Sequence, residues 1–385
     1  MKSYGKLFRI AMILALTLIS VGAIGFQTTG VRAQDELTCA GEPFLGAPSG
    51  DAAEGEMDEA ATPEEESADE MGDDAMAGDD GGLNIVFLPK DVVNPYFGTA
   101  ALGAQEAADE LGGQFQQVGP QESNAAEQVT FIQTLTQQQV DAIVVSANDT
   151  NALAPALTEA MNQGIAVVSY DSDVAPEARQ AFVNTADSEQ IGRIQVQIMG
   201  RLLDCQGEIA ILSAASTMTN QNTWIGFMED ELAKPGYEGM TLVEIAYGDD
   251  NPQLSYNKTI ELLTAYPDLA GIISPTTVGM TAAAQAIAAE GRSGEVQLTG
   301  LNLPNLARES VADGTVKEFA LWNPEDLGYL AYYTAAALIN GEITGEPGET
   351  FEAGRLGTYT IGENGVVLLG PPFLFDENNI DDFDF

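Results

Sequence analysis

From Leu83 onward, short apolar runs rich in Ile, Val and Phe alternate with longer amphipathic segments rich in Ala, Gln and Glu. Apolar runs of about four to eight residues are typical of strands buried on both faces, and the longer segments are typical of helices. The alternation predicts βα units and a mainly parallel sheet. The predicted strands are 84–88, 114–118, 142–146, 166–169, 181–184, 208–212, 241–247, 271–273 and 296–300, and helices are predicted to begin near 95, 123, 151 and 187. These units extend over roughly 300 residues, which favours two α/β domains over one.

A different pattern precedes the βα units. Lys2, Lys6 and Arg9 come before the apolar stretch 10–26, and residues 31–33 offer the small side chains that a signal peptidase recognises. The apolar stretch is shorter than the roughly 20 residues that span a membrane. We therefore predict a secretory signal peptide over residues 1–33 and export to the periplasm or to the outer face of the cell membrane.

Residues 34–82 are predicted to be an acidic disordered linker. Within them, 51–80 carry 14 acidic residues, no basic residue, and otherwise mostly Ala, Gly, Met and Ser. Such a segment lacks the apolar surface needed to fold. Its expected role is that of a solvated spacer between the cell envelope and the folded domains.

The charge of the whole chain excludes several functions. The 385 residues include 59 Asp and Glu, 14 Lys and Arg, and no His, for a formal net charge of -45. A surface this acidic repels phosphate backbones and anionic headgroups, so we expect no nucleic-acid or membrane-surface partner. The absence of His excludes Ser-His and Cys-His nucleophile pairs and His-ligated metals. We expect no metal and no cofactor.

Two cysteines, Cys39 and Cys205, are too few for a disulfide scaffold or an all-cysteine metal site. In an oxidising compartment they could pair and tie the N-terminal segment to the folded body. Two free thiols are the alternative. Lipid attachment at Cys39 is disfavoured, because residues 36–38 do not form a good lipid-attachment motif.

Polar and aromatic residues gather just after the predicted strands, where ligands bind in open parallel sheets. Carboxylates, amides and hydroxyls exchange hydrogen bonds with ligand hydroxyls, and flat aromatic faces cover C–H bonds. This combination predicts a site for a polyhydroxylated ligand. The candidate residues are Lys90, Asn94, Phe97, Asp171, Asp173, Asn220, Gln221, Trp224, Pro275, Thr277, Asn302 and Trp322.

Several candidates also have a purely structural interpretation. Asn94 is a good N-cap for a helix that starts with Pro95, and an aspartate such as Asp171 often forms a turn after a strand. Trp224 and Trp322, each taken alone, are more typical of a core. The recurrence of such residues at one edge of both predicted sheets favours the functional interpretation.

At these loops the chain resembles the type I periplasmic solute-binding proteins of ABC transporters, and most closely their rhamnose-binding and autoinducer-2-binding branch. The resemblance rests on 170–177, 220–224, 247–250, 320–330 and 379–385. It implies two similar doubly wound α/β lobes with a hinge, joined by three chain crossings near Asp187, near Lys317 and after Gly341. The expected lobes are 83–186 with 317–341, and 187–316 with 342–385.

The resemblance also implies a ligand set. Proteins that bind autoinducer-2 have a lysine that matches Lys90, an aspartate that matches Asp171, an Asp-Gln pair that falls on Asn220 and Gln221, and a Pro-x-Ala that falls on 275–277. Here Asn220 replaces a carboxylate and Thr277 replaces a small apolar residue. These differences favour a rhamnose-like deoxyhexose, with autoinducer-2 as the alternative.

The expected function is binding without turnover. A ligand bridging both lobes favours the closed form, which a membrane permease then recognises. The protein is expected to act as a monomer. An exported carbohydrate-active enzyme using Asp171 and Asp173 as acid and base is the alternative from another class, although two carboxylates on one loop are poorly placed to flank a scissile bond. A repressor with the same fold would need a basic DNA-binding headpiece, and this chain has the predicted signal peptide and acidic linker in that place.

Overall fold

The computed structural model describes residues 38–42, 44 and 82–385. The predicted signal peptide, 1–33, lies outside the described residues, as does nearly all of the predicted linker, 34–82. In the part of the chain that is described, no helix has both the length and the apolar character needed to cross a membrane.

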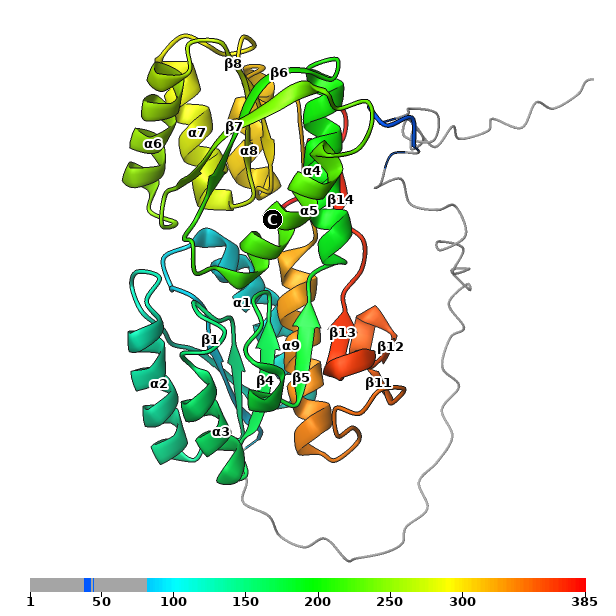
Figure 1. Cartoon of the computed structure of the whole chain (residues 1–385). Helices are drawn as coiled ribbons and strands as arrows, with labels where there is room; N and C mark the ends of the chain where they lie inside the picture. The colour runs from blue at the N-terminus through cyan, green and yellow to red at the C-terminus, as the bar shows by residue number, and fades with distance from the viewer. Residues whose placement is uncertain (1–37, 43, 45–81) are drawn as a thin grey trace, which may run out of the picture. The chain divides into compact units, whose positions relative to one another are not determined.

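The first sheet consists of six parallel strands in the order β13-β5-β4-β3-β1-β2 (Figure 1). Successive residues of its strands face two separate apolar cores, since Ile85 and Phe87 pack in one and Val86 and Leu88 in the other. Burial on both faces explains the continuous apolar runs in the sequence. The strands are β1 (Asn84–Leu88), β2 (Gln114–Gln117), β3 (Ala142–Val145), β4 (Ala166–Tyr170), β5 (Ala181–Asn184) and β13 (Val366–Leu368).

Helices cover both faces of this sheet and complete the first lobe. One face packs against α1 (Pro95–Leu111) and α9 (Pro324–Ile339), and the other against α2 (Ala125–Gln138) and α3 (Ala154–Asn162). Asn94 caps α1 as predicted, because its side chain accepts a hydrogen bond from the Tyr96 amide at 3.1 Å.

The second sheet repeats the same winding in the order β7-β6-β8-β9, again with parallel strands. In both sheets the first strand in the chain lies between the second and the third, which is a doubly wound topology. The strands are β6 (Gln206–Ser213), β7 (Gly239–Tyr247), β8 (Leu269–Ser274) and β9 (Gln297–Gly300), and the helices are α4 (Ser188–Leu202), α5 (Thr219–Leu232), α6 (Pro252–Ala265), α7 (Thr277–Ala289) and α8 (Pro304–Ala312).

The C-terminal part of the chain departs from the predicted lobe boundaries. The strand β10 (Glu318–Leu321) pairs antiparallel with β14 (Phe373–Asp376), and its Ala320 also pairs with Leu301, just after β9. It therefore belongs to the second lobe and not to the first. By contrast, β13 pairs with β5 in the first sheet, although 342–385 was assigned wholly to the second lobe. By the sheets to which its strands belong, the chain passes between the lobes at 185–187, 322–323 and 369–372.

Shorter elements complete the fold. An antiparallel pair of strands, β11 with β12, and several single-turn 3-10 helices lie along the chain. Their bounds are η1 (Pro176–Ala178), β11 (Thr350–Glu352), η2 (Gly354–Leu356), β12 (Thr358–Thr360), η3 (Glu363–Gly365) and η4 (Ile380–Asp382).

Residues 38–42 and 44 contact the second lobe. Cys39 forms a disulfide with Cys205, so the alternative of two free thiols is wrong. Glu42 accepts a hydrogen bond from Lys234 at 2.5 Å, and the guanidinium of Arg201 lies 4.3 Å from the ring centroid of Phe44. A covalent bond, an ion pair and a cation–π contact thus hold this segment against α4 and α5.

Close contact between α1 and α9 yields a first prediction. A Cβ added at Gly328 would meet the Ala100 carbonyl oxygen at 1.8 Å, whereas one added at Gly98 meets nothing within 4 Å. Gly328→Ala is expected to lower the free energy of unfolding by about 1–3 kcal/mol, because the two helices must separate. Gly98→Ala, on the exposed face of α1, is expected to leave it unchanged or raise it by up to about 1 kcal/mol. Urea denaturation of both variants is the measurement, and equal effects would contradict the packing argument.

Candidate functional site: a polar cavity between the lobes

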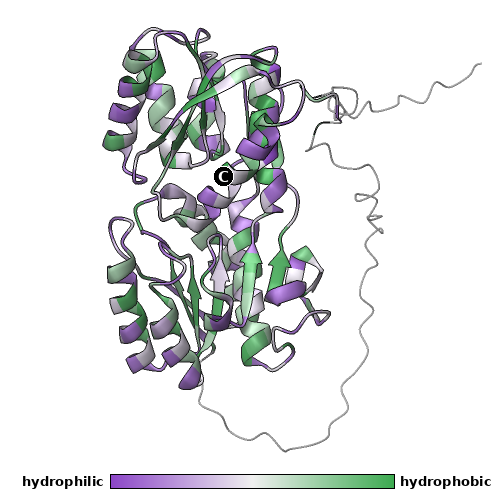
Figure 2. Cartoon of the chain, viewed as in Figure 1, coloured by the Kyte–Doolittle hydropathy of each residue, from purple (hydrophilic) through white to green (hydrophobic). Residues whose placement is uncertain are grey.

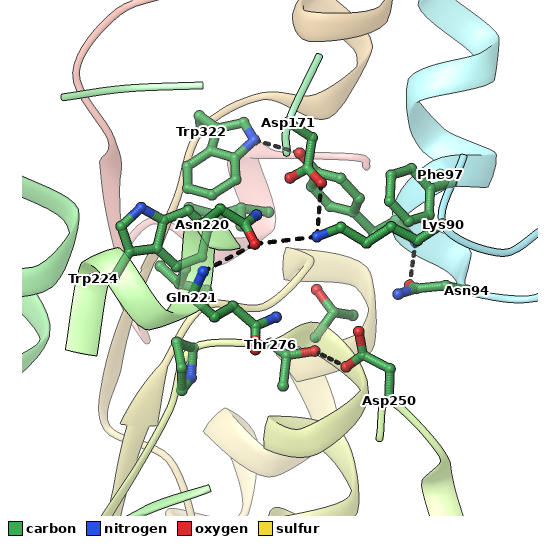
Figure 3. A pocket seen from close by; sticks show the side chains of 15 residues that line it. Lys90, Asn94, Phe97, Asp171, Asn220, Gln221, Trp224, Asp250, Thr276 and Trp322 are labelled. Atoms are coloured by element: carbon green, nitrogen blue, oxygen red, sulfur yellow. Dashed lines mark hydrogen bonds and ion pairs between the residues drawn. The ribbon is translucent and has the colours of Figure 1, made fainter. Parts of the chain in front are cut away.

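A cavity of about 380 Å³, counting the part open to solvent, lies where the loops after the strands of the two sheets meet (Figure 3). Both lobes contribute to its wall, which contains charged, amide, hydroxyl and aromatic side chains. This volume matches a ligand of small-molecule size. The lining residues are Lys90, Asn94, Tyr96, Phe97, Asp171, Asn220, Gln221, Trp224, Asp250, Pro275, Thr276, Thr277, Leu301, Leu321 and Trp322.

Lys90 and Asp171 form a buried ion pair in the first lobe. The distance from Lys90 Nζ to Asp171 Oδ2 is 3.1 Å, and the two side chains are 4% and 6% exposed. Ser146 donates a hydrogen bond to the same carboxylate oxygen at 2.7 Å. Asp171 has a φ of 59°, in the left-handed region that non-glycine residues rarely adopt. A strained backbone held by packing is a common feature of binding sites.

Lys90 also contacts the second lobe. Its ammonium donates a hydrogen bond to Asn220 Oδ1 at 3.2 Å, at the start of α5. Gln221 is fixed beside it, because its Oε1 accepts hydrogen bonds from Ser213 Oγ at 2.7 Å and from the Ala214 amide at 2.8 Å. The carbonyl oxygens of both amide side chains are thus occupied by protein donors, and their NH₂ groups remain as donors toward the cavity.

Buried amides hold the loops of the first lobe in place. Gln128, on α2, donates hydrogen bonds to the carbonyl oxygens of Pro89 and Ser146 at 2.9 and 2.8 Å and accepts one from the Asn148 amide at 3.0 Å. Asn148 in turn donates to the Lys90 carbonyl oxygen at 2.8 Å. These bonds join the loops after β1 and β3, so the backbone that carries Lys90 is positioned before any ligand arrives.

Aromatic side chains form one wall of the cavity. Trp322 Nε1 donates to the Tyr96 hydroxyl at 2.8 Å, and the rings of Trp224 and Trp322 lie 5.8 Å apart, centroid to centroid. Burial, and then the charge of Asp171, raises the pKa of Tyr96 well above its usual value, so the phenol stays neutral. The indole Nε1 of Trp224 is buried and has no hydrogen-bond partner among the described residues.

A second carboxyl group, Asp250, lies at the end of the cavity away from Asp171 and Trp322 (Figure 3). Thr276, at the start of α7, donates its hydroxyl hydrogen to Asp250 Oδ1 and does not cap its own helix. The Asp250 side chain is half-buried at the edge of the cavity. This burial raises the pKa of the Asp250 carboxyl to about 6.

The structure brings most of the predicted residues together. Asp173 and Asn302 are the exceptions, because neither lines the cavity. Both oxygens of Asp173 are bound by Arg179, at 2.6 and 2.7 Å, and Oδ1 also accepts from Ser169. The predicted residues that line the cavity are Lys90, Asn94, Phe97, Asp171, Asn220, Gln221, Trp224, Pro275, Thr277 and Trp322.

Asn302 is 1% exposed, and its amide oxygen accepts a hydrogen bond from the Leu303 amide at 2.9 Å. Its amide nitrogen donates to Thr281 Oγ1 at 3.2 Å, so both ends of the side chain are occupied inside the second lobe. An Asn that follows a strand therefore fixes a loop here and presents no group to a ligand.

Five lining residues were not predicted: Tyr96, Asp250, Thr276, Leu301 and Leu321. Three had a signal in the sequence, since Tyr96 follows the first strand beside Phe97, Asp250 follows the strand 241–247, and Thr276 lies between two predicted residues. Leu301 and Leu321 look like ordinary strand ends, and only the meeting of the two lobes places them at the cavity.

The chemistry of the cavity suits a neutral ligand rich in hydroxyl groups. It offers carboxylate acceptors at two ends, amide donors between them, and an aromatic wall for C–H groups. Among the described residues, no group of three or more acidic or cysteine side chains is arranged to hold a metal ion.

Comparison with known proteins gives a consistent result. The chain matches the family model described as periplasmic binding protein domain over residues 85–343. A sugar ABC transporter structure from Actinomyces odontolyticus is 44% identical, with a TM-score of 0.65, and the match covers 79% of this chain and 98% of that one.

Two further solved structures contain ligands. The solute-binding protein of an ABC transporter from Clostridium phytofermentans, with bound L-rhamnose, is 37% identical with a TM-score of 0.76, covering 78% of this chain and 98% of that one. LsrB from Clostridium saccharobutylicum, in complex with AI-2, is 26% identical with a TM-score of 0.75, covering 78% and 99%.

Proposed function

Since the chain belongs to the periplasmic binding protein domain family, as a solute-binding protein of a sugar ABC transporter, we propose that its cavity encloses one small sugar between the two lobes. Members of this family bind substrates and are not enzymes, and the alternative of an exported carbohydrate-active enzyme is rejected. The family is extracytoplasmic. The ligand-loaded protein delivers its sugar to a membrane permease and acts as a monomer.

The strongest support is the Lys90 ammonium, which contacts both lobes at once. It pairs with Asp171 of the first lobe and donates to Asn220 of the second. A sugar bound at this point exchanges hydrogen bonds with both lobes simultaneously, and only the closed arrangement makes both sets of contacts. Ligand binding therefore favours closure by the free energy of the contacts that the open form lacks.

A rhamnose-like deoxyhexose fits the wall best. Asp171 accepts hydrogen bonds from hydroxyls, the amide NH₂ groups of Asn220 and Gln221 donate to them, and Trp322 with Phe97 covers the apolar edge that a methyl group provides. The 37% identity to a protein holding L-rhamnose supports this choice.

Autoinducer-2 is the second candidate ligand. The similarity to the AI-2 complex of LsrB favours it, and Lys90, Asp171 and Gln221 match the residues expected for that ligand. Asn220 and Thr277 differ from that set, and both line the cavity. A site that pairs buried polar groups with ligand hydroxyls discriminates strongly, so two such differences are sufficient to shift specificity toward a sugar.

Thermal unfolding against a ligand panel tests the proposal. The protein, with Cys39 and Phe44 retained because they contact the second lobe, is heated with rhamnose, other deoxyhexoses, pentoses, hexoses and autoinducer-2. A ligand that binds only the folded state stabilises it by about 2.7 kcal/mol at a concentration of about 100 times Kd. We expect the largest rise of the midpoint with rhamnose. A rise with autoinducer-2 alone would reverse the order of the two candidates, and no rise with any ligand would contradict the sugar-binding proposal.

A further inference from the structure

Asp250 is a carboxyl group in the cavity without a cationic partner. No lysine or arginine among the described residues lies within ion-pair distance of it, whereas Asp171 pairs with Lys90 at 3.1 Å. Its Oδ1 accepts the Thr276 hydroxyl hydrogen, and its Oδ2 accepts no hydrogen bond from the described residues. One oxygen of a carboxyl that lines the cavity is therefore available to a ligand.

The backbone that positions Asp250 is conformationally strained. Asp249 and Asp250 have φ values of 52° and 48°, so two consecutive non-glycine residues occupy the left-handed region. Backbone bonds fix the turn, since the Gly248 and Asp249 amides donate to the carbonyl oxygens of Ser213 and Ala214, at 2.9 Å each. The result is that Asp249 is exposed to solvent while Asp250 lines the cavity. Such strain is found where a side chain must be aimed at a ligand.

Charged groups of the first lobe act on Asp250. The negative charges of Asp91 and Asp171 disfavour its ionised form, and the positive charge of Lys90 favours it, although burial is the largest influence. Three carboxyl groups and one ammonium therefore share this region. A ligand group that donates a hydrogen bond to Asp250 stabilises its ionised carboxylate, whereas an anionic ligand group is repelled by it.

We propose that Asp250 is a specificity-determining residue, whose Oδ2 accepts a hydrogen bond from a hydroxyl of a neutral sugar held at the other end by Asp171. This inference rests on the proposed function and adds a contact to it. Asp171 of the first lobe and Asp250 of the second then accept hydrogen bonds from hydroxyls at opposite ends of one ligand. Sugars lacking a hydroxyl at the Asp250 end, or carrying a carboxylate or phosphate there, bind more weakly.

The proposal implies that affinity depends on pH. A hydroxyl donating to Asp250 stabilises its ionised form, so the ligand binds best when Asp250 is deprotonated. With the pKa of this carboxyl at about 6 in the empty cavity, most molecules carry a protonated Asp250 one pH unit below that value, and the ligand must displace that proton to bind. Affinity is expected to fall about tenfold between pH 7.5 and pH 5.

The test is calorimetric titration of wild type, Asp250→Asn and Asp249→Asn with the sugar that gives the largest midpoint shift. The Asp250→Asn variant keeps an oxygen for the Thr276 hydroxyl but replaces the free acceptor by a donor. We expect its affinity at pH 7.5 to fall about 10- to 100-fold, since hydrogen bonds to charged groups are strong. Its affinity should also lose the pH dependence. Asp249→Asn, on the exposed neighbour, should bind within about twofold of wild type with the wild-type pH profile.

Stability separates this role from a structural one. A carboxyl whose pKa is raised from 3.8 to about 6 on folding destabilises the folded state when it is ionised, above about pH 6, and that penalty disappears below about pH 4. Asp250→Asn should therefore unfold at the same or a higher temperature than wild type at pH 7.5. Wild type that binds no sugar would refute the proposed function. Wild type that binds, with an Asp250→Asn variant of equal affinity or an unchanged pH profile, would overturn the role of Asp250 alone.

Discussion

Replacing Asp171 by alanine is expected to weaken sugar binding at least about a hundredfold and to destabilise the protein. The change removes an acceptor for ligand hydroxyls and leaves the Lys90 ammonium, 4% exposed, without its partner at 3.1 Å. Losing one member of a buried ion pair typically costs about 3–5 kcal/mol, because the remaining charge is buried and uncompensated. Removing a hydrogen bond between a ligand and a charged group adds a loss of about 1.5–3 kcal/mol in binding.

Asp171→Asn separates the two effects, because asparagine keeps the shape and one oxygen while removing the charge. The matched control is Asp173→Asn, two residues along the same loop, where the carboxylate binds Arg179 outside the cavity. Titration with the sugar and thermal unfolding are measured for both variants. We expect Asp171→Asn to lose affinity and Asp173→Asn to lose only stability. Equal losses of affinity would show that the loop, and not the Asp171 contact, determines binding.

Removing the disulfide is expected to have the second large effect, this time on stability. The bond between Cys39 and Cys205 spans 166 residues of sequence, so its loss increases the entropy of the unfolded chain considerably. The double variant Cys39→Ser with Cys205→Ser should lose about 2–5 kcal/mol of unfolding free energy. Affinity for the sugar should stay unchanged, because neither cysteine lines the cavity.

Guanidinium denaturation with and without a reductant measures this effect. The wild-type protein should unfold at a lower denaturant concentration when reduced, and the double variant should not respond to the reductant. A third variant, Lys234→Met, leaves the disulfide intact but removes the ion pairs of Lys234 with Glu42 and with the buried Glu231. Identical midpoints for oxidised wild type and the double variant would show that the disulfide contributes nothing to the stability of the second lobe.

The fold was predictable where local patterns are long and repeated. The strands 84–88 and 181–184 were located correctly to the residue, because both faces of the first sheet are buried and the apolar runs are continuous. The strand β13 was missed, and its segment was assigned to the wrong lobe. It has three residues, too few to show a period, and its pairing with β5 depends on a contact between segments far apart in the sequence.

In the candidate site, the sequence located the loops but not the orientation of each side chain. Asp171 and Asp173 follow the same strand and are indistinguishable by pattern. Arg179 takes up both oxygens of Asp173, and that leaves Asp171 to pair with Lys90 in the cavity. The partner of each carboxylate is set by tertiary contacts, which no local spacing of residues reveals.

By itself, the sequence determined the α/β class, the order of most elements and the strand ends at which polar residues gather, because backbone pairing and burial impose their periodicity on neighbouring residues. Only the tertiary structure decided the second and third crossings, the choice between Asp171 and Asp173, and the inward position of Asp250. Each of these depends on contacts between groups that are distant in the chain. Such contacts impose no periodic pattern on neighbouring residues, so the sequence does not reveal them.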